Sequence, residues 1–488
     1  MNGNIGFDND KYLKMQSEHI RKRISQFGDK LYLEFGGKLF DDYHAARVLP
    51  GFKPDSKLQM LLQLKEDAEI VMVINSGDIE KNKVNGNLGI TYDADVIRLY
   101  NVFGQIGLYV SSVVLTQYAG QASVDAFQRR LESMGIKVYH HYLIQGYPSD
   151  VQRIMSEDGF GKNDYIETTR KLVVVTAPGP GSGKMATCLS QLYHDYKRGI
   201  SAGYAKFETF PIWNIPLRHP VNIAYEAATS DLNDVNMIDP FHLEAYGETT
   251  VNYNRDVEIF PVLNAMFEKI IGESPYKSPT DMGVNMAGNC IIDEAVVCEA
   301  SRQEIVRRYY TALCGRRNGT VQDDEILKLE LMMKQAGVTI ADRKVVAPAL
   351  AKEQETDAPA AAMELPDGTI ITGKTSNLLG AASALLLNVL KHFGGIDDEV
   401  LLMAPAVIEP IQNLKVDHLG STNPRLHTDE TLIALSICAN TSDNAKCAMQ
   451  QISKLRGCEL HSSVILSSID ERTFKRLGVN VTCEPKYH

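Results

Sequence analysis

Short, almost continuously apolar segments alternate with helix-like segments along this chain, and this alternation most constrains its fold. Leu31–Phe35, Glu69–Ile74 and Lys171–Thr176 are typical of strands, whereas Lys57–Leu64 and Val124–Met134 are typical of helices. Strands without polar alternation are usually buried on both faces, as in parallel sheets covered by helices. The sequence therefore predicts an α/β fold with a mostly parallel sheet and flanking helices.

The most informative segment is Lys171–Lys184, where an apolar strand runs into the sequence Ala-Pro-Gly-Pro-Gly-Ser-Gly-Lys. A helix is predicted to follow over Met185–Lys197. Glycines let successive backbone N–H groups surround an anion, a helix N-terminus adds positive potential, and a lysine supplies a point charge. This P-loop-like segment predicts a phosphate-binding site with Lys184 as a catalytic candidate. Its predicted phosphate-binding residues are Gly179, Gly181, Ser182, Gly183 and Lys184.

The segment departs from the nucleotide-binding template G-x-x-x-x-G-K-[ST] at two positions. Pro178 replaces the first glycine, and Met185 stands where a Ser or Thr hydroxyl holds Mg²⁺ in nucleoside triphosphatases. Thr187 lies about 200° around the helix from Met185, so it cannot simply take over that role. A glycine-rich turn that binds nothing is the alternative interpretation. Cys188, in the same helix, is interpreted as a packing residue, with catalysis the less favoured alternative.

Residues 229–244 are rich in oxygen ligands and contain one imidazole. Four of them are candidate ligands of a hard cation such as Mg²⁺: Asp231, Asp234, Asp239 and His242. The favoured alternative is an acidic loop whose side chains serve turns and helix caps. Arg255 follows shortly afterwards and is a catalytic candidate that could contact a transferring phosphoryl group. A surface ion pair is the more ordinary role for such an arginine.

A second candidate anion site lies in the C-terminal part of the chain. Gly373-Lys374-Thr375-Ser376 precedes a long apolar helix predicted from about Ser376 to His392. Lys374 and Thr375 could bind phosphate at the start of this helix. An N-cap followed by an ordinary helix is the favoured alternative.

The order of strand-like and helix-like segments, together with composition, predicts the domain boundaries. Residues 1–165 are predicted to form an N-terminal α/β domain, and residues 166–345 to complete it with the P-loop-like segment and further helices. Residues 346–365 are rich in Ala, Pro and acidic residues, which predicts a linker. Residues 366–488 are predicted to form a smaller C-terminal α/β domain.

Charge and cysteine content exclude several classes of protein. The 50 basic and 61 acidic residues give a net charge of −11, which disfavours a nucleic-acid partner. No apolar run approaches the length of a membrane span, and the N-terminus lacks the pattern of a signal peptide. The 8 cysteines are scattered without a Cys-x-x-Cys motif. We therefore expect a cytoplasmic protein with no membrane partner, and its size favours a homo-oligomer.

Several stretches resemble a bacterial family described as a domain of unknown function with an N-terminal and a C-terminal part. The resemblance covers nearly the whole chain and is carried by Tyr32–Gly37, Ala177–Lys184, Phe207–Pro216, Ile238–Gly247, Asn252–Pro261 and Gly373–Leu379. It implies a cytoplasmic bacterial protein with an α/β fold. Some members of the family are labelled ATP-dependent peptidases. The sequence has neither a zincin helix nor a nucleophile elbow to match that label.

These observations favour an enzyme that binds phosphate or a nucleotide, as a phosphotransferase or hydrolase. Its expected partner is a phosphorylated small molecule or nucleotide, and ATP or another nucleotide and Mg²⁺ are the candidate cofactors. One alternative is a non-catalytic sensor of a phosphorylated metabolite or nucleotide, which the missing hydroxyl at Met185 favours. The other alternative is the ATP-dependent peptidase of the family label.

Overall fold

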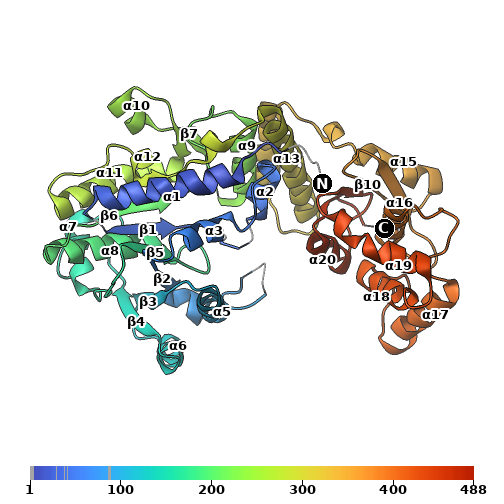
Figure 1. Cartoon of the computed structure of the whole chain (residues 1–488), viewed down its shortest axis with the longest axis horizontal. Helices are drawn as coiled ribbons and strands as arrows, with labels where there is room; N and C mark the ends of the chain where they lie inside the picture. The colour runs from blue at the N-terminus through green and yellow to red at the C-terminus, as the bar shows by residue number, and fades with distance from the viewer. Residues whose placement is uncertain are drawn as a thin grey trace. The chain divides into compact units, whose positions relative to one another are not determined.

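The chain forms two compact units, Ile5–Ala300 and Ser301–His488. The computed structural model describes residues 5–28, 30–37, 39–40, 42–85, 89–232 and 234–487 (Figure 1). The boundary between the units falls inside one helix, α13 (Glu294–Arg317), rather than at the predicted linker.

The N-terminal unit is built on a parallel sheet of seven strands in the order β4-β3-β2-β5-β1-β6-β9. The strands are β1 (Leu31–Phe35), β2 (Ala68–Asn75), β3 (Val110–Tyr118), β4 (Lys137–Tyr142), β5 (Leu172–Thr176), β6 (Gly203–Phe207) and β9 (Gly283–Val284). The β2 and β5 side chains are buried almost throughout, because helices cover both faces of the sheet. The predicted parallel α/β fold is therefore confirmed.

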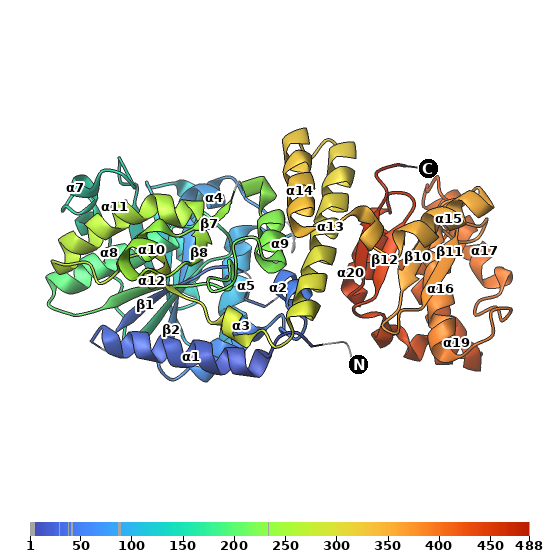
Figure 2. The ribbon, with the colours of Figure 1, turned by 90° about the horizontal axis from the view of Figure 1, so that it is seen from above.

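Helices α1 and α11 lie on opposite faces of this sheet (Figure 2). The helices of the unit are α1 (Asn9–Gln26), α2 (Tyr43–Val48), α3 (Ser56–Gln63), α4 (Ser76–Glu80), α5 (Tyr92–Gln105), α6 (Ala122–Ser133), α7 (Val151–Ile154), α8 (Lys184–Lys197), α9 (Pro220–Ala228), α10 (Pro240–Tyr246), α11 (Asn254–Ile271) and α12 (Pro279–Met282). A short antiparallel pair, β7 (Asn236–Ile238) and β8 (Val251–Tyr253), stands apart from the main sheet. None of the described helices is both long and apolar enough to cross a bilayer.

The C-terminal unit has a mixed sheet of four strands in the order β11-β10-β12-β13. They are β10 (Ala360–Glu364), β11 (Ile370–Lys374), β12 (Glu459–Ser462) and β13 (Asn480–Cys483). The helices are α14 (Asp323–Ala336), α15 (Val346–Thr356), α16 (Ala381–Gly394), α17 (Pro405–Asn413), α18 (Thr428–Cys438), α19 (Asp443–Gln450) and α20 (Ser468–Leu477). Leu385, Leu390 and Phe474 lie in its core.

Two expectations for this unit need correction. The predicted linker, residues 346–365, instead forms helix α15 and strand β10, whose Ala360–Met363 segment is fully buried. Pro348 lies in the first turn of α15, where a missing N–H costs no helical hydrogen bond. Helix α16 begins at Ala381, later than predicted, because residues 375–380 form a loop.

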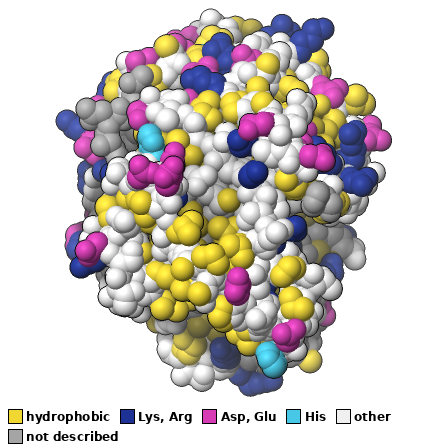
Figure 3. Space-filling model, turned by 90° about the vertical axis from the view of Figure 1, so that its right-hand side faces the viewer, with side chains coloured by type: hydrophobic (Ala, Val, Ile, Leu, Met, Phe, Trp, Pro, Cys, Tyr) yellow, Lys and Arg dark blue, Asp and Glu magenta, His cyan; other side chains and the backbone are white. Residues whose placement is uncertain are grey.

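Part of the apolar surface of the C-terminal unit stays outside its core. Leu401, Leu419, Ile433 and Ile437 are each more than 60% exposed. Hydrophobic side chains gather among charged ones on the face shown in Figure 3. Helix α18 has apolar side chains on both sides: Leu435 is buried in the core, and Ile433 and Ile437 face outward.

Candidate functional site

The glycine-rich loop connects β5 to α8 at the carboxyl end of the central strands. Gly183 has φ +90°, a left-handed conformation that favours glycine, and it directly precedes the first residue of α8. Gly179 packs against Tyr92, and a Cβ atom at Gly179 would lie only 2.5 Å from the Tyr92 hydroxyl oxygen. Two of the glycines are therefore required by the shape of the loop itself.

Neighbouring strands hold the loop through its carbonyl groups. The Thr116 hydroxyl, on β3, donates to the Ser182 carbonyl oxygen at 2.7 Å. The side-chain amide of Asn75, at the end of β2, donates to the Gly181 carbonyl oxygen at 3.3 Å. The N–H groups of Gly181, Ser182 and Gly183 donate to no protein acceptor in the described part of the chain. The loop therefore presents unpaired donors at a helix N-terminus, the arrangement that binds anions.

Two side chains of the loop also lack partners. Lys184, the first residue of α8, is half-buried and makes no hydrogen bond or ion pair with any described residue. The Ser182 hydroxyl is buried without a hydrogen-bond partner. Buried polar groups are usually paired, so the Ser182 hydroxyl points to a ligand or ordered water at the loop. The Lys184 ammonium is only half-buried and is available to an anion.

Charged side chains gather on the adjacent strands. Lys206, on β6, lies 2.7 Å from a Glu208 carboxylate oxygen and also contacts Asp256 in the first turn of α11. Glu34, on β1, accepts a hydrogen bond from the Tyr204 hydroxyl at 2.6 Å. We call Glu34, Lys206, Glu208 and Asp256 the carboxylate–lysine cluster.

Burial and mutual charge shift the pKa values within this cluster. Burial raises the pKa of Glu208 to about 7, although the Lys206 ammonium acts in the opposite direction. Burial also disfavours the charge on Lys206, but Asp256, Glu208 and Glu34 outweigh it and raise the pKa of that ammonium. The cluster therefore contains a firmly charged lysine beside a carboxyl group that exchanges protons near neutral pH.

Glu34 connects the cluster to the loop. In the sheet it lies between Val175 of β5 and Lys206 of β6. Burial, with a further contribution from Glu34, raises the pKa of the Cys188 thiol well above its usual range, while Lys184 lowers it. Glu34 and Lys184 thus both act on Cys188. This thiol stays protonated, as expected of a packing residue.

The structure does not bring the four candidate metal ligands together. Asp239 caps α10 and also accepts hydrogen bonds from Thr280, so its carboxylate is already satisfied. Asp231 is exposed, and the His242 ring is 2.9 Å from the Ser278 hydroxyl. Asp234 forms a two-point ion pair with Arg255. Among the described residues these four form no ligand group, and the neighbouring Asn233 lies outside that range.

Of the two C-terminal candidates, Thr375 bonds the start of α16 and Lys374 does not. The Thr375 hydroxyl accepts a hydrogen bond from the N–H of Ala381, the first residue of α16, at 3.2 Å. Lys374 is exposed at the end of β11. Both residues belong to the C-terminal unit, whereas the glycine-rich loop belongs to the N-terminal unit.

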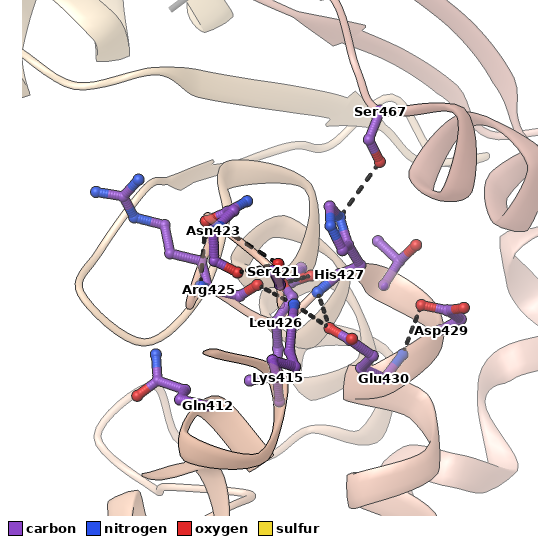
Figure 4. Close-up of polar contacts among 12 residues, drawn as sticks. Gln412, Lys415, Ser421, Asn423, Arg425, Leu426, His427, Asp429, Glu430 and Ser467 are labelled. Atoms are coloured by element: carbon purple, nitrogen blue, oxygen red, sulfur yellow. Dashed lines mark hydrogen bonds and ion pairs between the residues drawn. The ribbon is translucent and has the colours of Figure 1, made fainter. Parts of the chain in front are cut away.

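A Ser–His–Asp group that the sequence did not suggest lies in the C-terminal unit. The Ser467 hydroxyl points toward the His427 ring (Figure 4) at 3.2 Å, and Asp470 lies 3.0 Å from the same nitrogen, Nδ1. A catalytic triad needs the nucleophile and the acid on opposite ring nitrogens. Ser467 also donates to Asp470 and caps α20. This group is a helix cap, and it lends no support to the peptidase alternative.

The sequence alone does not predict the carboxylate–lysine cluster either. Its members come from β1, the end of β6 and α11, so only the folded sheet brings them together. One signal was available, because Glu34 is a charged residue inside an otherwise apolar strand. A buried strand rarely carries an acid without a specific partner.

Family models match both parts of the chain. The model described as "Domain of unknown function DUF1846, N-terminal" covers residues 5–337, and its C-terminal counterpart covers residues 341–488. The chain belongs to the DUF1846 family. A UPF0371 protein of Corynebacterium urealyticum is 58% identical over 488 residues, covering 100% of this chain and 98% of that relative. A UPF0371 protein of Streptococcus thermophilus is 56% identical over 481 residues, with 99% and 97% covered. The predicted membership is confirmed, and the relatives are bacterial.

Proposed function

We propose that this DUF1846 protein binds the phosphate group of a small molecule at the loop Gly179–Lys184 and catalyses a phosphotransfer or hydrolysis reaction. The observation that carries the proposal is the set of unpaired donors at the start of α8. Three backbone N–H groups, the Ser182 hydroxyl and the Lys184 ammonium lack protein partners among the described residues. The several oxygens of a phosphate group could accept hydrogen bonds from these donors, and the helix dipole would add to the attraction.

The carboxylate–lysine cluster supports a catalytic role. Its Glu34 lies on β1, which pairs with β5, and Lys206 lies on β6 beyond it, so a substrate held by its phosphate could extend toward the cluster. Glu208 would take up or release the proton of the reacting group, since burial places its pKa near neutrality. Lys206 would stabilise negative charge that develops there. A nucleotide such as ATP, with Mg²⁺, is the candidate cofactor.

Ligand binding to the pure protein tests the phosphate site. Inorganic phosphate, pyrophosphate, ATP, ADP and phosphosugars, each with and without Mg²⁺, would be screened by thermal unfolding and then by calorimetry. A ligand at a hundred times its dissociation constant should stabilise the protein by about 2.7 kcal/mol. We expect at least one of these compounds to bind, and Lys184→Ala to abolish that binding.

Lys197→Ala provides the matched control. It removes the same charge from the same helix, but at the far end, where Lys197 pairs with Glu157 on the surface. We expect Lys197→Ala to bind as the wild type does. The phosphate site is refuted if no compound binds, or if binding is unchanged in Lys184→Ala.

A non-catalytic sensor is the second candidate, and Met185 favours it. Its thioether cannot replace the hydroxyl that holds Mg²⁺ in nucleoside triphosphatases. The Thr187 hydroxyl is fully buried inside α8 and also lacks a partner. Incubation of the best ligand with Mg²⁺, followed by ³¹P NMR, separates the candidates: product formation indicates an enzyme, and binding without product indicates a sensor.

A further inference from the structure

A second polar group in the N-terminal unit combines a sulfur, a nitrogen and an oxygen donor. The Cys298 Sγ atom lies 3.5 Å from His219 Nε2 and 4.0 Å from a Glu294 carboxylate oxygen. His219 Nε2 also contacts that carboxylate. All three donor atoms lie within 4.8 Å of one another, and theirs is the single group of this kind found among the described residues.

Local structure places these donors together. Glu294 and Cys298 are four residues apart on α13, so they share one face of the helix. His219 caps the start of α9, where its Nδ1 atom accepts a hydrogen bond from the Val221 N–H at 3.2 Å. This bond turns Nε2 toward α13. The ring is buried, whereas the Glu294 side chain is 63% exposed, so the group is open to solvent on one side.

We propose that His219, Glu294 and Cys298 bind a zinc ion. Zinc combines thiolate, imidazole and carboxylate ligands, and a site with three protein ligands leaves the fourth position to water. Calcium and magnesium prefer oxygen ligands alone, so the sulfur and nitrogen donors argue against them. The Cys298 thiol would release its proton to solvent and coordinate as the thiolate.

The imidazole would have to change its hydrogen bonding. In the present structure the Val221 N–H occupies Nδ1, so the ring proton of neutral His219 lies on Nε2 and points to Glu294. Coordination through Nε2 moves that proton to Nδ1 and breaks the bond from Val221. Three metal–ligand bonds would replace it. The ion would join the start of α9 to the start of α13.

Cobalt(II) provides the test, because cobalt bound to a thiolate absorbs in the near ultraviolet. The full-length protein would be stripped with chelator and titrated with Co²⁺, and then with Zn²⁺ in competition. We expect a thiolate-to-cobalt band that Zn²⁺ removes. The band should be absent in Cys298→Ser and present in Cys438→Ser, which alters a cysteine of the C-terminal unit.

A second variant separates loss of the metal site from loss of the fold. Glu294→Gln removes an exposed carboxylate and should fold, yet it should weaken cobalt binding by at least about tenfold. Lys184→Ala should bind cobalt as the wild type does, so the result is independent of the phosphate site. The proposal is overturned if the wild type shows no band, if the band persists in Cys298→Ser, or if Glu294→Gln binds unchanged.

Discussion

The Thr116 hydroxyl donates a hydrogen bond of 2.7 Å to the Ser182 carbonyl oxygen and so attaches the glycine-rich loop to β3. Thr116→Val keeps the shape of the side chain but removes this bond. We expect the affinity for pyrophosphate, measured by calorimetry, to fall roughly fivefold. This hydrogen bond orders the loop, and the net contribution of one hydrogen bond is about 1 kcal/mol. Ser112→Ala is the control, since Ser112 is also buried on β3 but its hydroxyl has no partner. Equal affinity in Thr116→Val and the wild type would show that the loop does not need this attachment.

The contact between Gly179 and Tyr92 leads to a second prediction. A Cβ atom at residue 179 would overlap the Tyr92 ring, so Gly179→Ala should displace the loop. We expect it to abolish pyrophosphate binding and to lower the free energy of unfolding by about 1–3 kcal/mol. Adding Tyr92→Ala makes room for the methyl group, and the double variant should recover part of that stability. If the effects of the two substitutions simply add, the overlap is not their cause.

Much of this loop could be predicted from the sequence, because a strand, a glycine-rich turn and a helix are all local. The strand Leu31–Phe35 is likewise predicted with the bounds that the structure shows. The carboxylate–lysine cluster could not be predicted, since Glu34 and Lys206 meet only because β6 pairs with β1. Residues 346–365 are predicted to be a linker, which is wrong, because a run of alanines is typical of linkers but also suits a tightly packed strand.

Glu208 predicts a dependence of stability on pH. Burial raises its folded-state pKa to about 7, above the unfolded value of about 4.3. Between these values the folded state binds the additional proton, so the free energy of unfolding should fall as pH rises from about 4.3 to 7 and then level off. The contribution of Glu208 to the free energy of unfolding is at most about 4 kcal/mol.

Glu208→Gln removes this titration. Denaturant unfolding of both proteins between pH 5 and 8 measures the difference in their stability. We expect the variant to gain relative to the wild type as pH rises, whatever constant penalty it pays for its altered contact with Lys206. A difference that stays constant across this range would mean that Glu208 titrates normally.

Substitution of Arg343 should strongly lower the stability of the C-terminal unit. Its guanidinium is almost fully buried and donates to Glu459, to Thr482 and to the carbonyl oxygens of Leu460 and Asn480. Arg343→Ala removes a buried donor from each of these acceptors and leaves Glu459 with Arg307 as its one remaining arginine, so we expect a loss of about 3–5 kcal/mol in denaturant unfolding. Lys344→Ala, next in the chain, removes an exposed lysine and should change stability by less than about 1 kcal/mol. A loss of less than about 1 kcal/mol in Arg343→Ala would contradict the prediction.

The place of β10 in the C-terminal sheet decides where this protein can be divided. β10 pairs with β11 on one side and with β12 on the other. A fragment beginning at residue 366 would lack it, so two strand edges inside the sheet would lose their hydrogen-bond partner and become open to pairing with other chains. Such a fragment should aggregate. A C-terminal fragment that keeps this sheet intact therefore has to begin before α15, and one that keeps the whole unit has to begin near Ser301.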